Sequence, residues 1–350
     1  MRALSQERCR CDMEKIKAAI IGMGKMGRIR YDAMKRHTGY EIVAVCDVDK
    51  DALRGYNVPV YSDWRKCLES SGAEAVIVCT FNNDITEITC HALSNGSHVF
   101  SEKPPGRNLS ETKRIKEARN DSGLVLKFGF NHRYHNSIIE AKTLIDNKLL
   151  GDLVCARGVY GKAGTLEFEK EWRNDPTLSG GGILLDQGIH MMDLLIYFCG
   201  GFTQIHSSVN QLVWQDMETE DSAFAILKTE DGRVASLHSS AIQWKHRFEL
   251  DLICTNGGIS LNGLLTATKS YGEEIITYYR KDLKQSTGKL GNPIEHTMCF
   301  NEDSSWDYEM SEFYDAIVNG VPVKNGTIDD ALAVMELIEL VYLGSQGEGH

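Results

Sequence analysis

A segment in the middle of the sequence carries two acids and a histidine at helical spacing. Asp186, His190 and Asp193 stand at i, i+4 and i+7, so they share one face of the helix expected over residues 183–198. Histidine titrates near neutral pH, and a carboxylate one turn away can stabilise its protonated ring. The three residues therefore suit proton transfer at a hydroxyl group. No pair of cysteines or histidines with metal-ligand spacing accompanies them, so we expect no metal.

A lysine follows the strand expected over residues 98–100, at the edge where an open α/β sheet binds its ligands. This residue, Lys103, comes directly after Glu102. Oxidation of a secondary alcohol needs a base for the hydroxyl proton and a cation or donor that stabilises the developing alkoxide. His190 and Lys103 supply these two groups. The plainer alternatives are a solvated loop lysine and an exposed Asp186–His190 pair without catalytic function.

A glycine-rich turn lies near the start of the chain, between an apolar strand expected over residues 17–21 and a helix. It reads Gly22, Met23, Gly24, Lys25, Met26, Gly27. In this context the first glycine permits a tight turn, the second lets the backbone approach a pyrophosphate, and the third allows helix and strand to pack closely. We expect the whole turn, with Lys25 and Met26, to bind a dinucleotide. A purely structural turn is the alternative.

An acid at the end of the next expected strand, residues 41–46, completes this pattern. Asp47 stands about 20 residues past the turn, where a carboxylate can accept hydrogen bonds from both ribose hydroxyls. Asp47 and the nearby Asp49 would repel a 2′-phosphate, and no arginine lies between them. The predicted cofactor is therefore NAD rather than NADP. The alternative is an acid that only caps the turn before Lys50.

Composition and charge exclude several other classes of protein. The 350-residue chain has a formal net charge of -11 and no block of lysine or arginine, which argues against nucleic acid and anionic membranes as partners. The 10 cysteines are scattered, as reduced thiols are. The first residues lack the apolar core of a signal peptide, and no uninterrupted apolar run reaches membrane-spanning length. We expect a cytoplasmic protein with a disordered tail over residues 1–14.

The order of apolar runs predicts two domains. Short strands alternate with helices over residues 15–131, which indicates α/β architecture with a doubly wound parallel sheet of the Rossmann type. An α+β domain over residues 132–326 should carry a large, mostly antiparallel open sheet, with strands at 153–160, 205–213, 222–229, 234–240, 248–254 and 275–279. Residues 327–350 form a C-terminal helix and tail, with Thr327 and Asp330 at capping-box spacing. One face of an open sheet must be covered, so we expect a homo-oligomer, a dimer or tetramer, formed through it.

Together these motifs resemble the glucose-fructose oxidoreductase, inositol dehydrogenase and rhizopine-catabolism (Gfo/Idh/MocA) family over nearly the whole chain. The resemblance is carried by the glycine turn, by Glu102, Lys103, Pro104, by Asn131, His132, Arg133, Tyr134, and by Gly180, Gly181, Gly182 continuing to Asp186, Gly188, His190, Asp193. It implies a bound nicotinamide cofactor and a catalytic lysine, aspartate and histidine that map onto Lys103, Asp186 and His190. We assign His190 as base, Lys103 as alkoxide stabiliser and Asp186 as orienting group, and Lys103 as proton acceptor stays an alternative.

The chain departs from the family pattern beside the expected cofactor site. It carries Thr80, Phe81, Asn82 where many members have Thr-Pro-Asn, and Ile85 where a histidine often follows. The edge of the cofactor pocket should therefore differ. Thr80 and Asn82 remain available as cofactor contacts, together with Glu102 and Lys103.

Residues with aromatic faces and forked donors lie in or beside the loops expected to face His190. The candidate substrate contacts are His132, Arg133, Tyr160, Lys162, Trp172 and Arg173, in addition to Lys103, Asp186 and His190. They suit a sugar, and residues 172–176 resemble those of members that act on nucleotide-activated (UDP-) amino sugars for surface polysaccharides. An inositol, polyol or free-sugar dehydrogenase, an NAD-using glycosidase and a silent NAD-binding regulator are the alternatives.

Overall fold

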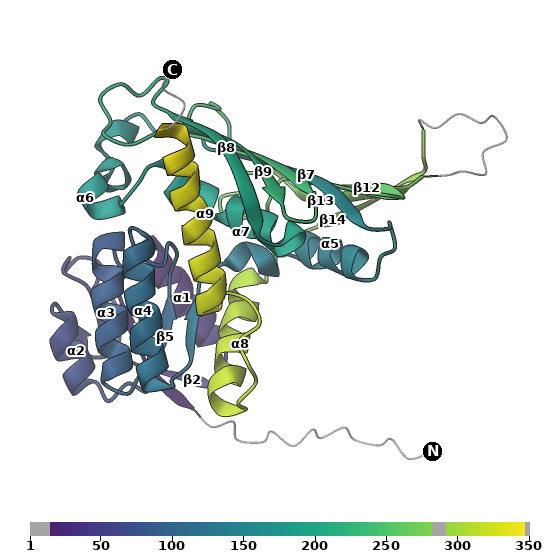
Figure 1. The fold of residues 1–350 in the computed structure, drawn as a ribbon. Coiled ribbons are helices and arrows are strands. Elements are labelled where there is room, and N and C mark those ends of the chain that lie inside the picture. Colours follow the sequence, from purple (N-terminus) through teal and green to yellow (C-terminus); the bar gives the residue numbers. More distant parts are fainter. Residues whose placement is uncertain (1–14, 282–291, 347–350) are drawn as a thin grey trace, which may run out of the picture.

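The structure is a computed structural model that describes residues 15–281 and 292–346. It consists of two β-sheets with helices packed on them (Figure 1). The disordered tail expected over residues 1–14 lies outside the described residues.

The first sheet is parallel, with six strands in the order β3-β2-β1-β4-β5-β6. Its strands are β1 (Ile16–Ile21), β2 (Tyr40–Cys46), β3 (Val60–Tyr61), β4 (Ala75–Val78), β5 (His98–Ser101) and β6 (Leu126–Phe128). Its helices are α1 (Lys25–Arg36), α2 (Trp64–Ser70), α3 (Asn82–Ser94) and α4 (Leu109–Ser122). The strand order reverses between β1 and β4, and ligands bind at the carboxyl edge of such a switch point. The predicted doubly wound sheet is confirmed.

Three elements of this half were not predicted, namely β3, α2 and α4. β3 has only two residues. α4 buries just four side chains, and two of these are the polar Glu111 and Thr112. Its sequence therefore lacks the apolar stripe on which a helix prediction depends.

The second sheet has eight strands in the order β14-β13-β12-β11-β7-β10-β9-β8. They are β7 (Leu153–Gly161), β8 (Phe202–Asn210), β9 (Ser222–Thr229), β10 (Val234–Ser240), β11 (Arg247–Cys254), β12 (Gly257–Asn262), β13 (Glu274–Arg280) and β14 (Glu295–Phe300). Neighbouring strands are antiparallel except β7 and β10, which confirms the mostly antiparallel sheet. β12 and β14 were not predicted, because β12 opens with two glycines and β14 is mostly exposed.

Helices cover one face of this sheet (Figure 1). They include α5 (Asn136–Asp146), α7 (Ile189–Cys199) and the π-helical segment η4 (Leu184–Gly188), which leads into α7. The short helices η1 (Asn131–Tyr134), η2 (Phe168–Lys170), η3 (Trp172–Asn174) and α6 (Pro176–Ser179) lie in the connections before them. The helical stretch Pro176–Cys199 could span a membrane by length and composition, but 78% of its most apolar part is buried inside the protein. It serves as a core helix.

The two C-terminal helices tie the halves together. α8 (Ser305–Val318) buries Met310, Phe313 and Tyr314 in the same hydrophobic cluster as β1, so it packs with the first sheet although the expected division placed it in the second domain. α9 (Ile328–Gln346) packs on α4 as well as on α7 and β8, and Figure 1 shows it running between the two halves. The predicted capping box is present, because the Thr327 hydroxyl accepts from the Asp330 N–H at 3.0 Å and the Asp330 carboxylate accepts from the Thr327 N–H at 2.9 Å.

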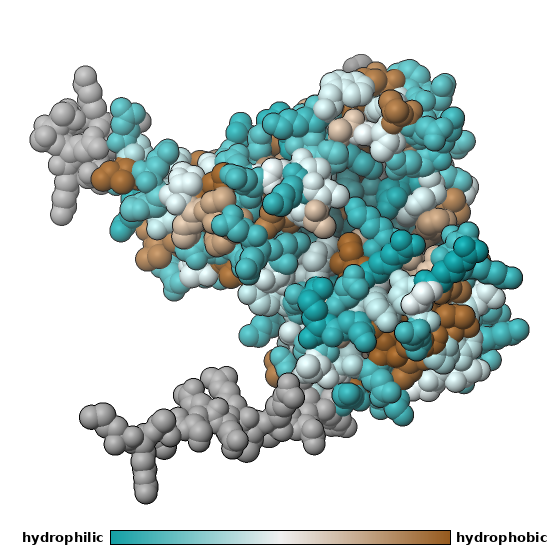
Figure 2. Space-filling view, turned by 180° about the vertical axis from the view of Figure 1, so that it is seen from behind, coloured by the Kyte–Doolittle hydropathy of each residue, from teal (hydrophilic) through white to brown (hydrophobic). Residues whose placement is uncertain are grey.

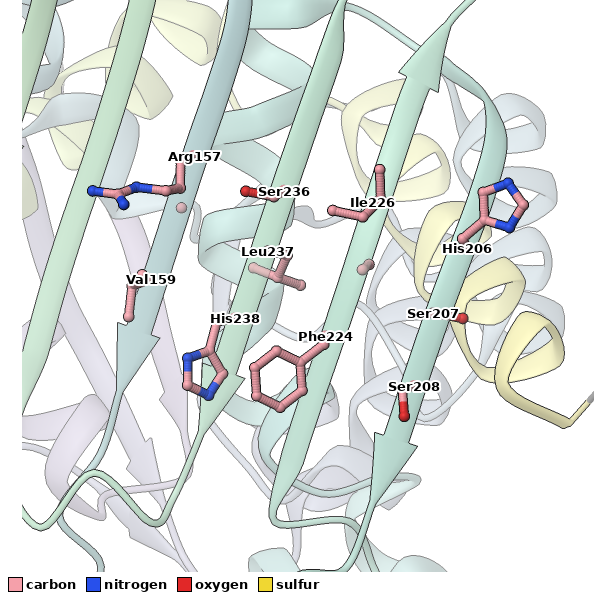
Figure 3. A pocket seen from close by; sticks show the side chains of 12 residues that line it. Arg157, Val159, His206, Ser207, Ser208, Phe224, Ile226, Ser236, Leu237 and His238 are labelled. Atoms are coloured by element: carbon pink, nitrogen blue, oxygen red, sulfur yellow. The ribbon is translucent and has the colours of Figure 1, made fainter. Parts of the chain in front are cut away.

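The opposite face of the second sheet is open. Outward-facing Phe224 and Ile226 on β9 are 43% and 51% exposed. A shallow hollow of about 400 Å³ lies over β7, β8, β9 and β10, and there the rings of Phe224 and His238 stack at 4.1 Å (Figure 3). The face seen in Figure 2 is mostly hydrophilic, with hydrophobic residues in separate groups.

Candidate active site

The glycine turn lies between β1 and α1 with the geometry that its sequence predicts. Gly22 has a φ of +92°, and a Cβ atom there would come within 2.5 Å of the carbonyl oxygen that follows β4. A Cβ atom on Gly27 would collide with the backbone of Gly22, whereas one on Gly24 would meet nothing within 4 Å. Two glycines thus permit close packing, and the third leaves open space for a ligand. Lys25 is exposed and Met26 half-buried at the start of α1.

Asp47 lies beside this turn, at the end of β2. Its carboxylate accepts hydrogen bonds from the N–H of Met23 at 2.6 Å and of Asp49 at 2.9 Å. Arg28 on α1 donates to the Met23 carbonyl at 3.3 Å, which places a cation close to this edge. Arg28 was not predicted here, because it lies on α1 and not beside Asp47 in the sequence.

Of the other four predicted cofactor contacts, Lys103 meets Asp186, and the remaining three differ in their availability. The Thr80 hydroxyl is buried and has no hydrogen-bond partner within the described residues. Asn82 donates its amide to the Ser179 carbonyl at 2.8 Å, and Glu102 accepts from the Arg30 guanidinium at 2.6 Å. The unpartnered Thr80 hydroxyl and the open space above Gly24 fit a dinucleotide, whereas Glu102 and Asn82 are engaged within the protein.

Lys103 and Asp186 meet across 83 residues of sequence. The Lys103 ammonium lies 2.5 Å from the backbone carbonyl of Asp186 and 3.5 Å from its carboxylate, and the two side chains are 17% and 14% exposed. Asp186 belongs to η4, and π-helical turns of this kind are frequent at functional sites. Burial lowers the pKa of Lys103, and Asp186 opposes this shift.

Three cations surround the Asp186 carboxylate. Besides Lys103, Arg173 donates to it at 3.3 Å and the Lys162 ammonium lies 4.0 Å away. Although burial opposes the shift, these cations hold the pKa of Asp186 well below its usual range. Within the described part of the chain, Asp186 makes no hydrogen bond to His190. Its position is that of an ionised group that holds Lys103.

His190 lies on the first turn of α7, buried to 4% exposure. Its ring stacks on that of His132 with centroids 3.7 Å apart and an angle of 14° between planes. Burial lowers the pKa of His190 well below its usual value of 6.5, and the neighbouring Lys103 and His135 lower it further. The neutral ring can therefore accept a proton.

Asp193 does not belong to the same site. Arg133 donates to its carboxylate at 2.8 and 2.6 Å and to Asp330 at 3.0 Å, with side-chain exposures of 3% for Arg133 and 1% for Asp193. Burial raises the pKa of Asp193 and Arg133 opposes this. The prediction that Arg133 contacts substrate is therefore corrected, because its guanidinium is buried and occupied by two carboxylates. It links η1, α7 and α9.

The remaining predicted substrate contacts surround the Asp186 cluster. The ring of Trp172 stacks on that of Phe81 with centroids 4.4 Å apart. Phe81, which replaces the usual proline of the family pattern, therefore links the loop after β4 in the first sheet to the loop after β7. Arg173 lies over the Trp172 ring at 4.5 Å and is 37% exposed. Tyr160 is 3% exposed and stacks on Tyr271. Arg173 is thus accessible to a ligand, whereas Tyr160 lies behind the site.

Glu220 is a site residue that sequence analysis missed. Its carboxylate accepts from the N–H groups of Gly182 and Leu184, both at 2.9 Å, and from the Tyr342 hydroxyl at 2.9 Å. It fixes the start of the helix that carries Asp186. No local pattern signals this contact, because Glu220 is 36 residues or more from both N–H groups.

Two family models match the chain. One, described as an oxidoreductase family with an NAD-binding Rossmann fold, covers residues 16–130, and the GFO/IDH/MocA C-terminal domain covers residues 138–260. Myo-inositol 2-dehydrogenase of Thermotoga maritima is 26% identical over 238 residues, or 64% of this chain and 68% of that protein. D-glucoside 3-dehydrogenase of Escherichia coli is 29% identical over 254 residues, or 65% and 69%.

The fold extends this similarity to the full chain. The structure of levoglucosan dehydrogenase in complex with NADH and levoglucosan has a TM-score of 0.84 at 19% identity and covers 96% of this chain and 98% of that one. The two family models together cover more than half of the chain. The chain therefore belongs to the Gfo/Idh/MocA family of oxidoreductases and contains its NAD-binding Rossmann domain.

Proposed function

We propose that the protein is an NAD-dependent dehydrogenase acting on a secondary alcohol of a sugar or polyol. The observation that carries this proposal is the meeting of Lys103, ionised Asp186 and neutral His190 at the carboxyl edge of the first sheet. This edge also carries the glycine turn and the unpartnered Thr80 hydroxyl. The relatives named for inositol and glucoside oxidation support the same chemistry.

The residues of this chain divide the reaction between them. NAD supplies the hydride acceptor when bound, and the glycine turn, Asp47 and Thr80 are the groups that would hold it. A ring nitrogen of His190 takes the hydroxyl proton, and the Lys103 ammonium donates a hydrogen bond to the oxygen that becomes negative. Asp186 keeps Lys103 protonated and in place. In the reverse direction protonated His190 returns the proton to the carbonyl oxygen.

His190, rather than Lys103, is the proton acceptor of this proposal. Burial lowers the pKa of both groups, but Lys103 donates to Asp186, which opposes the shift and favours its charged form, whereas Lys103 itself adds to the shift at His190. A group that is neutral before the reaction can accept a proton without first losing one. The arrangement therefore supports His190 as base and Lys103 as alkoxide stabiliser.

The substrate class follows from the accessible polar groups and the relatives. Lys162 and Arg173 surround the approach to Asp186 and offer donors to hydroxyl groups. The named relatives oxidise inositols and glucosides, which favours a free sugar or polyol over the UDP-amino sugar suggested by residues 172–176.

A panel experiment tests the function. The purified protein is incubated with NAD and with inositols, free sugars, glucosides or UDP-sugars while NADH absorbance and ketone product are followed. We expect NADH and ketone to appear in equal amounts with at least one inositol or free sugar. If protein that is shown to bind NAD forms no NADH with any of these alcohols, the proposed dehydrogenase activity is overturned. Glycoside cleavage without net NADH would support the glycosidase instead.

The open face of the second sheet supports a homo-oligomer as part of this proposal. Exposed Phe224 and Ile226 form an apolar surface that a second copy would remove from water. Sedimentation of Ile226→Lys should show a smaller species than the wild-type dimer or tetramer. Leu166→Lys, at a fully exposed loop position, is the control that should leave the assembly unchanged. A monomeric wild-type protein would contradict the proposal.

We propose a cytoplasmic location because the cysteines that the structure describes are unpaired. They are all free thiols, and Cys46, Cys67, Cys199 and Cys254 are buried. Unpaired thiols favour a reducing compartment. Fractionation of the producing cell, with activity in the cytoplasmic fraction, checks this assignment.

A further inference from the structure

Two histidines that lie 58 positions apart stack face to face in the interior. His132 comes from η1, directly after the first sheet, and His190 from α7, which covers the second. Their centroids are 3.7 Å apart, and the residues are 5% and 4% exposed. The reaction described above uses His190 but gives His132 no part.

Hydrogen bonds on both nitrogens fix the state of the His132 ring. Its Nδ1 lies 3.0 Å from Asn131 Oδ1, which can only accept, so Nδ1 carries the proton. Its Nε2 lies within hydrogen-bond distance of the Tyr160 hydroxyl, at 3.0 Å. The Asn131 amide is held in this orientation because its Nδ2 donates to the Ser305 hydroxyl at 3.5 Å. Burial lowers the pKa of His132 well below 6.5, so the ring is neutral and, with its proton on Nδ1, is confined to one tautomer.

His190 lacks a comparable support. Its Nδ1 is buried and has no hydrogen-bond partner in the part of the chain that the structure describes. A catalytic histidine is commonly oriented by a carboxylate or carbonyl on its second nitrogen. Asp186, which could have done this, holds Lys103 instead. Within the described residues, His190 has two ring contacts: the face of His132 at 3.7 Å and the more distant, perpendicular ring of Tyr160 at 6.3 Å. The closer, flat contact with His132 is the one that can fix the plane of the His190 ring.

The charged groups around the pair explain why His132 must stay neutral. Lys103 faces His190 from the loop after β5, and His135 packs on His132 at 5.6 Å while bonded to Glu274 at 2.7 Å. A second positive ring at 3.7 Å would repel the proton that His190 receives. The fixed tautomer of His132 prevents this without removing the aromatic contact.

We propose that His132 is a positioning residue, which holds the ring of the proton acceptor His190 through its stacked, neutral face. The effect of His132 on catalysis rests on the proposed function. The stacking of the two rings does not depend on that function. His132 exchanges no proton with substrate. Its contribution is the orientation and dry surroundings of His190, and an aromatic ring without nitrogens should supply most of both.

The test compares His132→Phe, which keeps a flat neutral ring, with His132→Ala, which removes it. The first readout is independent of activity. Nitrogen-15 NMR of labelled histidines in the NAD-saturated protein follows the titration of His190. We expect its midpoint to stay below 6.5 in wild type and in His132→Phe, and to rise in His132→Ala because water replaces the lost ring. His296→Ala, at an exposed position on β14, is the matched control and should change nothing.

The second readout is turnover. His132→Ala should lower kcat about 10- to 100-fold with KM and NAD affinity nearly unchanged, and His132→Phe should recover most of the loss. Equal damage by both variants in NMR and turnover would show that the ring nitrogens matter and would overturn the proposal. An unchanged His190 titration in His132→Ala would also overturn it. If wild type oxidises no alcohol, the proposed function fails, while the NMR comparison still decides whether His132 controls His190.

Discussion

The cofactor edge and the alcohol edge of the site are built in different ways. The cofactor edge, formed by the glycine turn and Asp47, is shaped by the backbone, and Asp47 accepts from the Met23 N–H across only 24 sequence positions. The alcohol edge, formed by Lys103, Asp186 and His190, is held by side-chain charges, and Lys103 contacts Asp186 across 83 sequence positions. A short sequence pattern can therefore specify the first region almost completely. For the second it specifies which residue types are present but not which of them meet.

The two acids on one helix illustrate this limit. Asp186 and Asp193 are seven positions apart and were expected to share a face with His190. In the structure Asp186 lies in a π-helical turn among three cations, whereas Asp193 is buried against Arg133. We propose Asp186 for the chemistry, whereas Asp193 belongs to a buried ion pair. Substitutions at the two positions should therefore separate activity from folding.

The largest expected effect is on turnover. Lys103→Ala and His190→Ala should each lower kcat by about 10²- to 10⁴-fold, because each removes a group that stabilises charge or takes a proton in the transition state. NAD affinity, measured by fluorescence titration, should change less than about twofold, since neither group forms the glycine turn. Lys170→Ala, at an exposed lysine, is the control. Full activity in either variant would refute its assigned role.

The second effect concerns stability. Arg133→Met leaves the buried Asp193 carboxylate without its main partner and should lower the free energy of unfolding by about 3–5 kcal/mol. Lys142→Met breaks a more exposed ion pair with Asp146 and should cost less than about 1 kcal/mol. Urea unfolding measures both. Similar small losses would mean that Arg133 is not a structural link, and its role as a substrate contact would have to be reconsidered.

The sequence predicted elements better than partners, for a physical reason. Thr327 and Asp330 form their capping box because both members lie within one helical turn. Arg133 was misassigned because the two acids that occupy it come from α7 and α9. Glu220 was missed because the helix start that it binds lies in a distant part of the chain. Contacts within one turn can be predicted from the local sequence, whereas contacts between elements depend on how the sheets and helices pack.

A smaller effect is expected at the cofactor edge. Asp47→Ser removes the charged acceptor proposed for the ribose hydroxyls and should weaken NAD binding by about 1.5–3 kcal/mol, measured by calorimetry. The same change removes the repulsion against a 2′-phosphate, and Arg28 lies close enough to this edge to favour it. NADP binding should therefore improve. Asp51→Ser, at an exposed acid paired with Arg54, is the matched control, and equal effects at both positions would contradict the role of Asp47.

The smallest expected effect is that of pH on kcat/KM, which should hardly change in the range near pH 6.5 where an ordinary histidine titrates. Only neutral His190 accepts a proton, so alcohol oxidation should fall as pH falls through its pKa. Burial, with Lys103 and His135, places that pKa well below 6.5. Between pH 8 and pH 6.5, kcat/KM should therefore fall less than about twofold, the loss expected of a histidine that is half protonated at pH 6.5. In Lys103→Met, if its remaining activity permits measurement, one source of repulsion is gone, and the acidic limb should move to higher pH. A limb centred at or above 6.5 in wild type would mean that the reacting proton goes elsewhere, with Lys103 as the next acceptor to test.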